Sequence, residues 1–590
     1  MCGIFGYAGP ACEAASLVFS GLKELEYRGY DSWGIALDRD GQVATVKDVG
    51  KLVAAPDDMG NAGLAIGHTR WATTGAVTHG NAHPHSDCSG QLAIVHNGIV
   101  ENYLPLKEGL LARGHRFQSE TDSEVIAHLL EEALAADPGA TLAEGLRRVS
   151  LLLEGMNAVV AMDVSRDEMA AVKNGSPLVI GVNGGSNYLA SDIAALLKHT
   201  RRIIWMRDGQ VAGVSKDQVS LMDAATGTAI EPHVEEVAWD PQQAELGPYR
   251  HYLEKEIWEQ PGLIRQILAE GGEQATQLAE FLREASDIYF TACGTAYHAG
   301  LMGNYILADV GKRMAHSIYA HELANFAPFM QEPQAVVALS QSGETIDVLD
   351  AVRAAHASAV PVAALVNVPG STLSREADFT LMLGAGPEKC VLSTKAFTAK
   401  VAYLMLAAGV LGGQEADMRE SLAAAAAEMD AQQDAERLAA VRALAERIQD
   451  RAHMFLVGRG YCYPLALEAA LKVKEVSYMH AEGFASGELK HGVIALVEEG
   501  TPCLVFAPEG PDEAQALTTA GELKARGALI IGVGPRNHAV FDVHLPVQAR
   551  GHAFALAALP PVQMLAYNLA LLRGLDPDKP RNLAKSVTVR

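Results

Sequence analysis

The second half of this 590-residue chain contains one strand–turn–helix pattern twice, which limits the folds available to it. Residues 287–297 (DIYFTACGTAY) resemble residues 453–463 (HMFLVGRGYCY): an apolar run leads into a glycine turn and then a helix. Further apolar runs follow each copy, at 335–339 and 362–366 and at 502–506 and 529–533. Strands that alternate with helices predict two doubly wound α/β domains with parallel sheets.

The first part of the chain has a different pattern. Short alternating apolar runs and Gly-rich turns dominate residues 2–235, which predicts an α+β domain of packed sheets. A polar, Pro-containing stretch at 239–248 (WDPQQAELGP) indicates a linker, and an Ala-rich helical region at 417–451 joins the α/β domains. The predicted parts are the α+β domain 2–235, a linker 236–249, α/β domains 250–435 and 436–575, and a tail 576–590.

Charge and cysteine content exclude several partners and compartments. Asp and Glu number 71 against 47 Lys and Arg, a net charge of −24 that argues against nucleic acid or an anionic membrane as the main partner. The seven cysteines form no CxxC pair, which fits a reducing cytoplasm. No secretory signal is visible, and Pro560, Pro561 and Asn568 interrupt the apolar stretch 554–572, so we expect a cytoplasmic protein without a membrane span.

Cys2 directly follows Met1, which gives its thiol a special chemistry. Removal of Met1 would leave a free α-amino group on the residue that carries the thiol, so one residue would hold a nucleophile and its base. Considered alone, Cys2 fits better as a small apolar residue that begins a buried strand. The motifs that follow reverse this preference.

Three motifs fit an amide-hydrolysing site around Cys2. The segment 68–75 (HTRWATTG) supplies Arg70, whose planar fork suits a carboxylate. Asn97 and Gly98, at a strand end, offer an amide and a backbone N–H to an oxyanion. Asp122, in a segment that opens a helix, could pair with the α-amino group of a bound amino acid. Each alone could be a surface arginine, a hairpin turn or a helix cap, but together they predict the site.

Residues 2–235 resemble the glutaminase domain of the N-terminal-nucleophile (class II) glutamine amidotransferases. The resemblance implies that Cys2 is the nucleophile, that Arg70 and Asp122 bind glutamine, and that Asn97 and Gly98 form the oxyanion hole. Trp71 matches the tryptophan with which aminosugar-forming members gate an ammonia channel. The histidines at 79, 83 and 85 lack Cys or carboxylate ligands at usual spacing, so we expect a loop over the glutamine pocket and no metal.

The segment 337–345 (VALSQSGET) runs from an apolar strand into a helix. The hydroxyls of Ser340, Ser342 and Thr345, with turn N–H groups, predict a phosphate cradle at the helix N-terminus. A hydroxyl-rich helix cap would look similar, but the hydroxyls outnumber what a cap needs. The second repeat has APEG (507–510) at this place, so only the first repeat is expected to hold a phosphate.

Acid–base groups follow in the second repeat. Glu468, Lys472 and Glu475 share one helical face, which is typical of a solvated salt-bridge stripe but also suits proton transfer. His491 follows after a glycine turn, and an imidazole suits the opening of a sugar ring. Lys585 lies in an otherwise apolar tail, where desolvation favours a neutral amine that can form an imine with a ketose.

These motifs resemble paired sugar-isomerase domains, and the whole chain is similar to the isomerizing glutamine:fructose-6-phosphate aminotransferase family. The resemblance implies an N-terminal-nucleophile glutaminase that passes ammonia to fructose 6-phosphate and forms glucosamine 6-phosphate and glutamate, without a cofactor. Glu475 would move the C1/C2 proton, His491 would open the ring from the neighbouring subunit of a homodimer, and Lys585 would form the imine. The substrate-binding residues would be Thr295, Ser340, Gln341, Ser342, Thr345 and Val391 with 393–395, supported by Glu468 and Lys472.

Some positions depart from this family. Ala296 stands where serine is usual, Lys389 and Cys390 where small apolar residues are common, and Thr74 where many members have histidine. These departures leave open the alternative that the chain is a paralogue that acts on another ketose phosphate. Amidotransferases that act on aspartate or phosphoribosyl pyrophosphate need phosphate-binding loops that the sequence lacks. A non-enzymatic sugar-phosphate regulator would have no use for Cys2 or Glu475.

Overall fold

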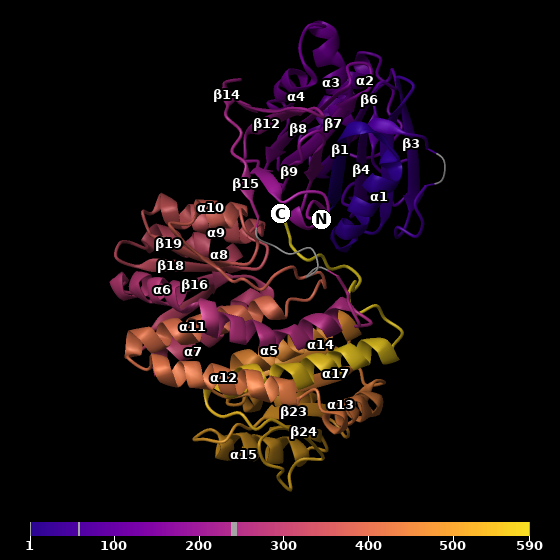
Figure 1. Ribbon diagram of the computed structural model, residues 1–590. Coiled ribbons are helices and arrows are strands. Elements are labelled where there is room, and N and C mark those ends of the chain that lie inside the picture. The colour runs from indigo at the N-terminus through magenta and orange to yellow at the C-terminus, as the bar shows by residue number, and fades with distance from the viewer. Residues whose placement is uncertain (1, 57–58, 238–244, 589–590) are drawn as a thin grey trace. The chain divides into compact units, whose positions relative to one another are not determined.

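The computed structural model describes residues 2–56, 59–237 and 245–588 (Figure 1). The chain divides into two compact units, Met1–Glu245 with Ser586–Arg590, and Leu246–Lys585, which we call unit 1 and unit 2. Half of the predicted linker, at 238–244, lies outside the described residues, as does Met1.

Unit 1 contains two antiparallel sheets. The first has the order β15-β11-β9-β10-β1-β4-β2-β3 and the second β14-β13-β12-β8-β7-β6-β5. The first sheet consists of β1 (Gly3–Cys12), β2 (Ser32–Arg39), β3 (Gln42–Val49), β4 (Ala62–Arg70), β9 (Val179–Val182), β10 (Asn187–Ala190), β11 (Arg202–Trp205) and β15 (Glu235–Glu236). The second consists of β5 (His85–Ser86), β6 (Leu92–Gly98), β7 (Asn157–Asp163), β8 (Glu168–Asn174), β12 (Gln210–Val214), β13 (Val219–Asp223) and β14 (Ala229–Ile230).

The two sheets and the helices on their outer faces form four layers, because successive side chains along a strand point to opposite faces of the sheet. Along β1, Ile4 enters the core between the sheets, whereas Phe5 joins the core beneath α1 (Ala14–Leu25). The outer face of the second sheet is covered by α3 (Glu124–Ala136) and α4 (Leu142–Ser150), next to α2 (Tyr103–Ala112) (Figure 1). This is the α+β architecture predicted from the strand patterns.

Unit 2 contains two five-stranded parallel sheets with the same topology. Their orders are β17-β16-β18-β19-β20 and β22-β21-β23-β24-β25. The strands of the first are β16 (Ile288–Ala292), β17 (Ala315–Tyr319), β18 (Ala335–Ser340), β19 (Val362–Val366) and β20 (Phe379–Met382). Those of the second are β21 (His453–Gly458), β22 (His480–Ala485), β23 (Pro502–Phe506), β24 (Leu529–Gly534) and β25 (Val543–Pro546). The strands predicted from the repeat all form.

A central helical layer lies between these two sheets (Figure 1). It contains α5 (Tyr252–Glu270), α6 (Gly272–Glu284), α7 (Gly294–Asp309), α11 (Lys395–Gly412), α12 (Glu415–Ala431), α13 (Ala435–Ile448), α14 (Cys462–Ser477), α16 (His552–Ala557) and α17 (Leu559–Leu572). The outer faces are covered by α8 (Ala320–Phe326), α9 (Ile346–Ala357) and α10 (Thr372–Glu376) on one sheet and α15 (Glu513–Lys524) on the other.

Two stretches of this central layer, Lys395–Gly412 and His552–Leu572, are long and apolar enough to cross a membrane. In each, 83% of the apolar window is buried inside the protein. The second stretch is interrupted as expected from Pro560 and Pro561: α16 ends at Ala557 and α17 begins at Leu559, with the two prolines in its first turn, where proline is compatible with a helix. The apolar composition of both stretches therefore reflects burial within unit 2.

Candidate active sites

Cys2 lies immediately before β1, and the end of β4 brings Trp71 beside it. The Trp71 backbone N–H donates to Cys2 Sγ at 3.2 Å. Burial raises the pKa of the Cys2 thiol, while the Trp71 N–H and the Arg70 guanidinium act in the opposite direction. The thiol therefore needs a base before it can act as a nucleophile.

Asn97 and Gly98 form the end of β6, and Asn97 contacts Cys2. Asn97 Nδ2 donates to the Cys2 carbonyl at 3.0 Å, and its Oδ1 lies 3.1 Å from His68 Nε2. Gly98 has φ 132°, and a β-carbon there would lie 1.9 Å from the Met156 carbonyl oxygen, so no other residue fits. The strand end therefore holds an amide donor beside Cys2 in a fixed orientation.

Arg70 and Asp122 are both buried in unit 1. The Arg70 guanidinium donates to the carbonyls of Thr74, Gly75 and Ala76, at 2.5 to 3.1 Å. Asp122 Oδ2 accepts the Val100 N–H at 2.8 Å. Arg70 thus also holds its own loop in place, a role that the sequence did not indicate.

The histidines of the 79–85 segment do not all gather in one place: His83 and His85 lie together, with ring centroids 4.4 Å apart, and His79 lies apart from them. His79 is exposed, whereas His83 and His85 are buried. The His83 ring stacks on His68 with ring centroids 4.2 Å apart, and burial holds the pKa of His83 well below its usual value. His83 and His85 of this segment are thus part of the core, whereas the sequence had indicated only a loop over the glutamine pocket.

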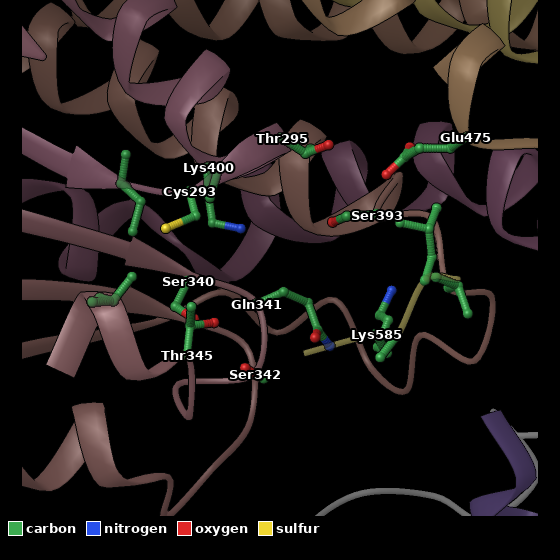
Figure 2. Close-up of a pocket in the computed structure, with 16 residues that line it drawn as sticks. Cys293, Thr295, Ser340, Gln341, Ser342, Thr345, Ser393, Lys400, Glu475 and Lys585 are labelled. Carbon is green, nitrogen blue, oxygen red and sulfur yellow. The ribbon is translucent and has the colours of Figure 1, made fainter. Parts of the chain in front are cut away.

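A pocket in unit 2 lies at the carboxyl edge of the first parallel sheet, where ligands bind in open α/β folds (Figure 2). It brings together most of the residues predicted for the sugar site: Thr295, Ser340, Gln341, Ser342, Thr345, Val391, Glu475 and Lys585. Ala296 also lines it, whereas Glu468 and Lys472 are not among its lining residues.

The loop between β18 and α9 forms the hydroxyl-rich part of this pocket (Figure 2). Ser340 Oγ accepts the Gly343 N–H at 2.9 Å, and Ser342 Oγ accepts the Glu344 N–H at 3.1 Å. Thr345 precedes α9 without a capping bond from its side chain. These hydroxyls and the helix N-terminus suit a phosphate group.

Glu468, Lys472 and Glu475 form a charged row along α14. Lys472 Nζ lies 2.7 Å from Glu475 Oε2, 3.4 Å from Glu468 Oε1 and 3.0 Å from Thr295 Oγ1 of α7. Glu468 and Lys472 are each 1% exposed, so the interpretation as a solvated stripe is wrong. Burial alone would lower the pKa of Lys472, but the two carboxylates raise it. Lys472 is therefore a fixed cation beside Glu475.

Lys585 makes a buried ion pair that the sequence did not indicate. Its Nζ donates to Glu388 Oε2 and to the Leu392 carbonyl, at 2.6 and 3.1 Å. We expected a desolvated amine in an apolar tail; the side chain is 5% exposed, and its partner Glu388 was missed because it lies 197 residues away in sequence.

Lys400, on α11, is a further pocket residue that we did not predict. It lines the pocket and is fully buried, and its Nζ donates to the Ala396 carbonyl at 3.3 Å (Figure 2). Burial lowers the pKa of Lys400 to about 8. The available signal was a lysine within the apolar stretch 396–411, where a charge is costly unless it has a function.

The remaining predicted positions lie outside this pocket. His491 is exposed in a short 3₁₀ turn (Glu488–His491) and is not among the lining residues. The Lys389 and Cys390 N–H groups donate to Glu256 Oε1, and Cys390 is buried. A second cavity, at the corresponding edge of the other sheet, is lined by Tyr305 of α7 with Ser486 and other residues of the second repeat.

Protein-family models match both units. A glutamine amidotransferase domain matches residues 68–198, and the SIS domain matches twice, at 281–409 and 447–573. With the two parallel sheets, these matches define a glutamine amidotransferase domain followed by a pair of sugar-isomerase domains. The predicted fold class is confirmed.

Relatives match over the full chain. The glutamine–fructose-6-phosphate aminotransferase [isomerizing] of Pyrococcus horikoshii is 41% identical over 603 residues, and that of Symbiobacterium thermophilum 42% over 616, with 100% of each chain covered. The solved C-terminal domain of glucosamine-fructose-6-phosphate aminotransferase from Francisella tularensis gives a TM-score of 0.52 at 31% identity, covering 57% of this chain and 99% of that one. The chain belongs to the family of isomerizing glutamine–fructose-6-phosphate aminotransferases, which confirms the predicted family.

Proposed function

We propose that this chain hydrolyses glutamine in unit 1 and uses the ammonia in unit 2 to convert fructose 6-phosphate into glucosamine 6-phosphate. The observation that carries this proposal is the pocket of unit 2. It combines a hydroxyl-rich helix N-terminus with the Glu475 carboxylate and the Lys585 amine. The family assignment supports the same reaction.

In the glutaminase reaction, the Cys2 thiolate attacks the glutamine side-chain amide. The α-amino group of Cys2, free once Met1 is removed, takes the thiol proton and returns it to the leaving ammonia. The Asn97 amide and Gly98 N–H stabilise the oxyanion, and Arg70 and Asp122 bind the two ends of the amino acid. Water then hydrolyses the thioester to glutamate. Trp71 gates the passage of ammonia.

In the sugar reaction, Lys585 forms an imine with C2 of the opened ketose and releases water. Ammonia displaces the lysine, and Glu475 transfers a proton from C1 to C2 to give the 2-amino aldose. Lys472 holds the Glu475 carboxylate in place, and Glu468 holds Lys472. His491 of a neighbouring copy opens the ring. The steps transfer protons and involve no redox change.

The phosphate of the sugar binds at the N-terminus of α9. Ser340, Gln341, Ser342 and Thr345 surround it, with Thr295 at the start of α7. Lys400 adds a positive charge at the same pocket, which offsets the hydroxyl that Ala296 lacks. Val391 packs against the sugar.

We further propose that the domain boundaries follow the five parts predicted from the sequence, with ends at 235, 249, 435, 575 and 590. The active form is a cytoplasmic homodimer, because His491 is exposed in this chain and the pocket needs a ring-opening acid. Nucleic acid and membranes are not partners of a chain with a net charge of −24.

Incubation with glutamine and fructose 6-phosphate, followed by assays of both glutamate and amino sugar, tests this function. We expect the two products in equal amounts. Glutamate without amino sugar would contradict the proposal. Product from a different ketose phosphate, with none from fructose 6-phosphate, would identify the chain as a paralogue.

A further inference from the structure

Four side chains of unit 1 form a cluster of metal-ligand type that the proposed glutamine site does not use. They are Cys88, His115, His128 and Glu131, and their ligand atoms all lie within 4.8 Å of one another. Cys88 follows β5, His115 follows α2, and the other two lie one turn apart on α3. The cluster thus joins three segments of the chain.

The distances within this cluster match a tetrahedral coordination shell. His115 Nδ1 and His128 Nδ1 are 3.3 Å apart, and each lies 3.6 Å from Cys88 Sγ. Glu131 Oε2 lies 3.2 Å from His115 Nδ1 and 3.4 Å from His128 Nδ1. Zinc bonds of about 2.0 Å to N or O and 2.3 Å to S place tetrahedral ligands about 3.3 Å apart, or about 3.5 Å where one is sulfur.

The outer ring nitrogens of the two histidines each face a carboxylate. His115 Nε2 is 3.1 Å from Glu132 Oε1, and the buried His128 Nε2 faces Glu124 Oε1 at 3.6 Å. A proton on each Nε2 leaves each Nδ1 with a bare lone pair. Two such lone pairs cannot hydrogen-bond to each other, whereas a cation between them satisfies both. Carboxylates behind metal-bound imidazoles are the usual second layer of such sites.

We propose that Cys88, His115, His128 and Glu131 bind one zinc ion. The donor set, with sulfur, two imidazoles and a carboxylate, is of the type that zinc prefers. Because the protein fills all four positions, the site is structural and leaves none open for substrate. The thiolate and Glu131 balance the two positive charges, and the Cys88 proton passes to solvent. Cys88 is exposed, which gives the ion a path of entry.

The zinc ion would also stabilise the segment that leads to Asp122. The Glu124 carboxylate that faces His128 accepts the backbone N–H groups of Gln118 and Ser119, at 2.7 and 2.6 Å. A fixed His128 thereby fixes Glu124 and the turn before α3. The absence of a metal was predicted for the histidines at 79–85, and the irregular spacing of Cys88, His115, His128 and Glu131 gave no signal for this second cluster.

The test is metal analysis of the full-length protein after saturation with zinc chloride and removal of the excess. We expect about one zinc per chain, and replacement by cobalt(II) should give the visible spectrum of a tetrahedral site with a thiolate charge-transfer band. Cys88→Ser should lose that band, and Glu131→Gln should weaken zinc binding by about tenfold or more. A chelator should lower the thermal unfolding midpoint of the wild-type protein.

Two cysteine variants serve as matched controls. Cys12→Ser should keep the zinc, and so should Cys2→Ala, which separates this proposal from the proposed glutaminase activity. Zinc content well below one per chain would overturn the proposal and leave a hydrogen-bonded cluster with a protonated His128. Equal zinc binding by Cys88→Ser and wild type, both folded by circular dichroism, would also overturn it.

Discussion

Lys585 and Glu388 form a buried ion pair in which Nζ lies 2.6 Å from Oε2, with side chains 5% and 0% exposed. Burial alone would raise the pKa of Glu388, but the charge and hydrogen bond of Lys585 lower it to about 2. An amine attacks a ketone only in its neutral form. The pair therefore positions Lys585, and the substrate must displace this contact before the amine can react.

Glu388→Gln should change the acid stability of the protein. Since the folded pKa of Glu388 lies below its ordinary value of 4.5, its stabilising effect is present above about pH 4.5 and is lost as the pH falls toward 2. In Glu388→Gln, the free energy of unfolding should not show this decrease at acid pH. At pH 7 it should be lower than that of the wild type by about 3–5 kcal/mol, because Lys585 remains buried without its partner. Urea unfolding at several pH values measures both effects.

The control is Glu376→Gln, which removes the partner of Arg353 in a pair with side chains 44% and 29% exposed. That change should cost less than about 1 kcal/mol. Equal losses in the two variants would contradict the assigned role of burial.

Lys585→Ala should abolish amino-sugar formation and leave glutamine hydrolysis largely intact. The variant removes the only amine that we assign to the imine, while unit 1 keeps its own site. Borohydride should trap fructose 6-phosphate on Lys585 of the wild type, detectable as a mass shift of its peptide. Lys474→Ala, on the exposed face of α14, should retain both activities. Persistent amino sugar in Lys585→Ala would remove the imine role.

Lys400 should make the affinity for the sugar phosphate depend on pH. Its pKa of about 8 means that the unliganded protein loses the Lys400 charge above pH 8, so KM for fructose 6-phosphate should rise there. Glu388 and Glu468 favour the charged form and Lys585 opposes it, but burial dominates. Lys400→Gln should raise KM about 10- to 150-fold, the loss of one charge-assisted hydrogen bond of about 1.5–3 kcal/mol.

The same variant separates Lys400 from Glu256, whose pKa burial raises to about 8. If Lys400 causes the alkaline rise in KM, Lys400→Gln removes it. A rise that survives the substitution would assign it to Glu256 or another group.

Cys2→Ala should end glutamine-dependent synthesis but spare the isomerisation of the sugar phosphate. Loss of both would show that the two activities are not separable. Mass analysis of the active wild-type protein should find Cys2 as the first residue, since a retained Met1 would place the proposed base in a peptide bond. Cys12→Ser should behave as wild type.

Gly98→Ala should abolish glutaminase turnover because its β-carbon would meet the Met156 carbonyl oxygen at 1.9 Å. Gly185 is a matched control: its φ of 129° is similar, but nothing lies within 4 Å of an added β-carbon. Gly185→Ala should therefore cost only the backbone strain, about 1–3 kcal/mol, and keep activity. Equal effects would mean that φ, and not the contact, matters at Gly98.

The sequence predicted what depends on local order. Buried parallel strands appear as continuous apolar runs, so β18, β19, β23 and β24 could be located within a residue or so. The hydroxyls of the α9 N-terminus lie together in sequence as they do in space. The shared face of Glu468, Lys472 and Glu475 follows from helical spacing alone.

Contacts between distant segments could not be predicted in this way. Spacing shows which side chains share a face but not what covers it, so the buried state of Lys472 was missed. Glu388 meets Lys585 only because the tail returns to the first sugar-isomerase repeat. The Cys88 cluster could not be predicted for the same reason, because its residues come from separate segments of the chain.

The sugar pocket is divided between the two repeats, with Thr295 and the α9 loop from one and Glu475 from the other. Were these repeats separate chains, the fraction of assembled pockets would follow an association equilibrium and fall on dilution. Their covalent connection through α12 and α13 makes that encounter intramolecular, so it does not depend on the concentration of the chain. The parts of the pocket that one chain supplies are therefore made in equal numbers at translation, and only the proposed contribution of His491 from a neighbouring copy still depends on the protein concentration.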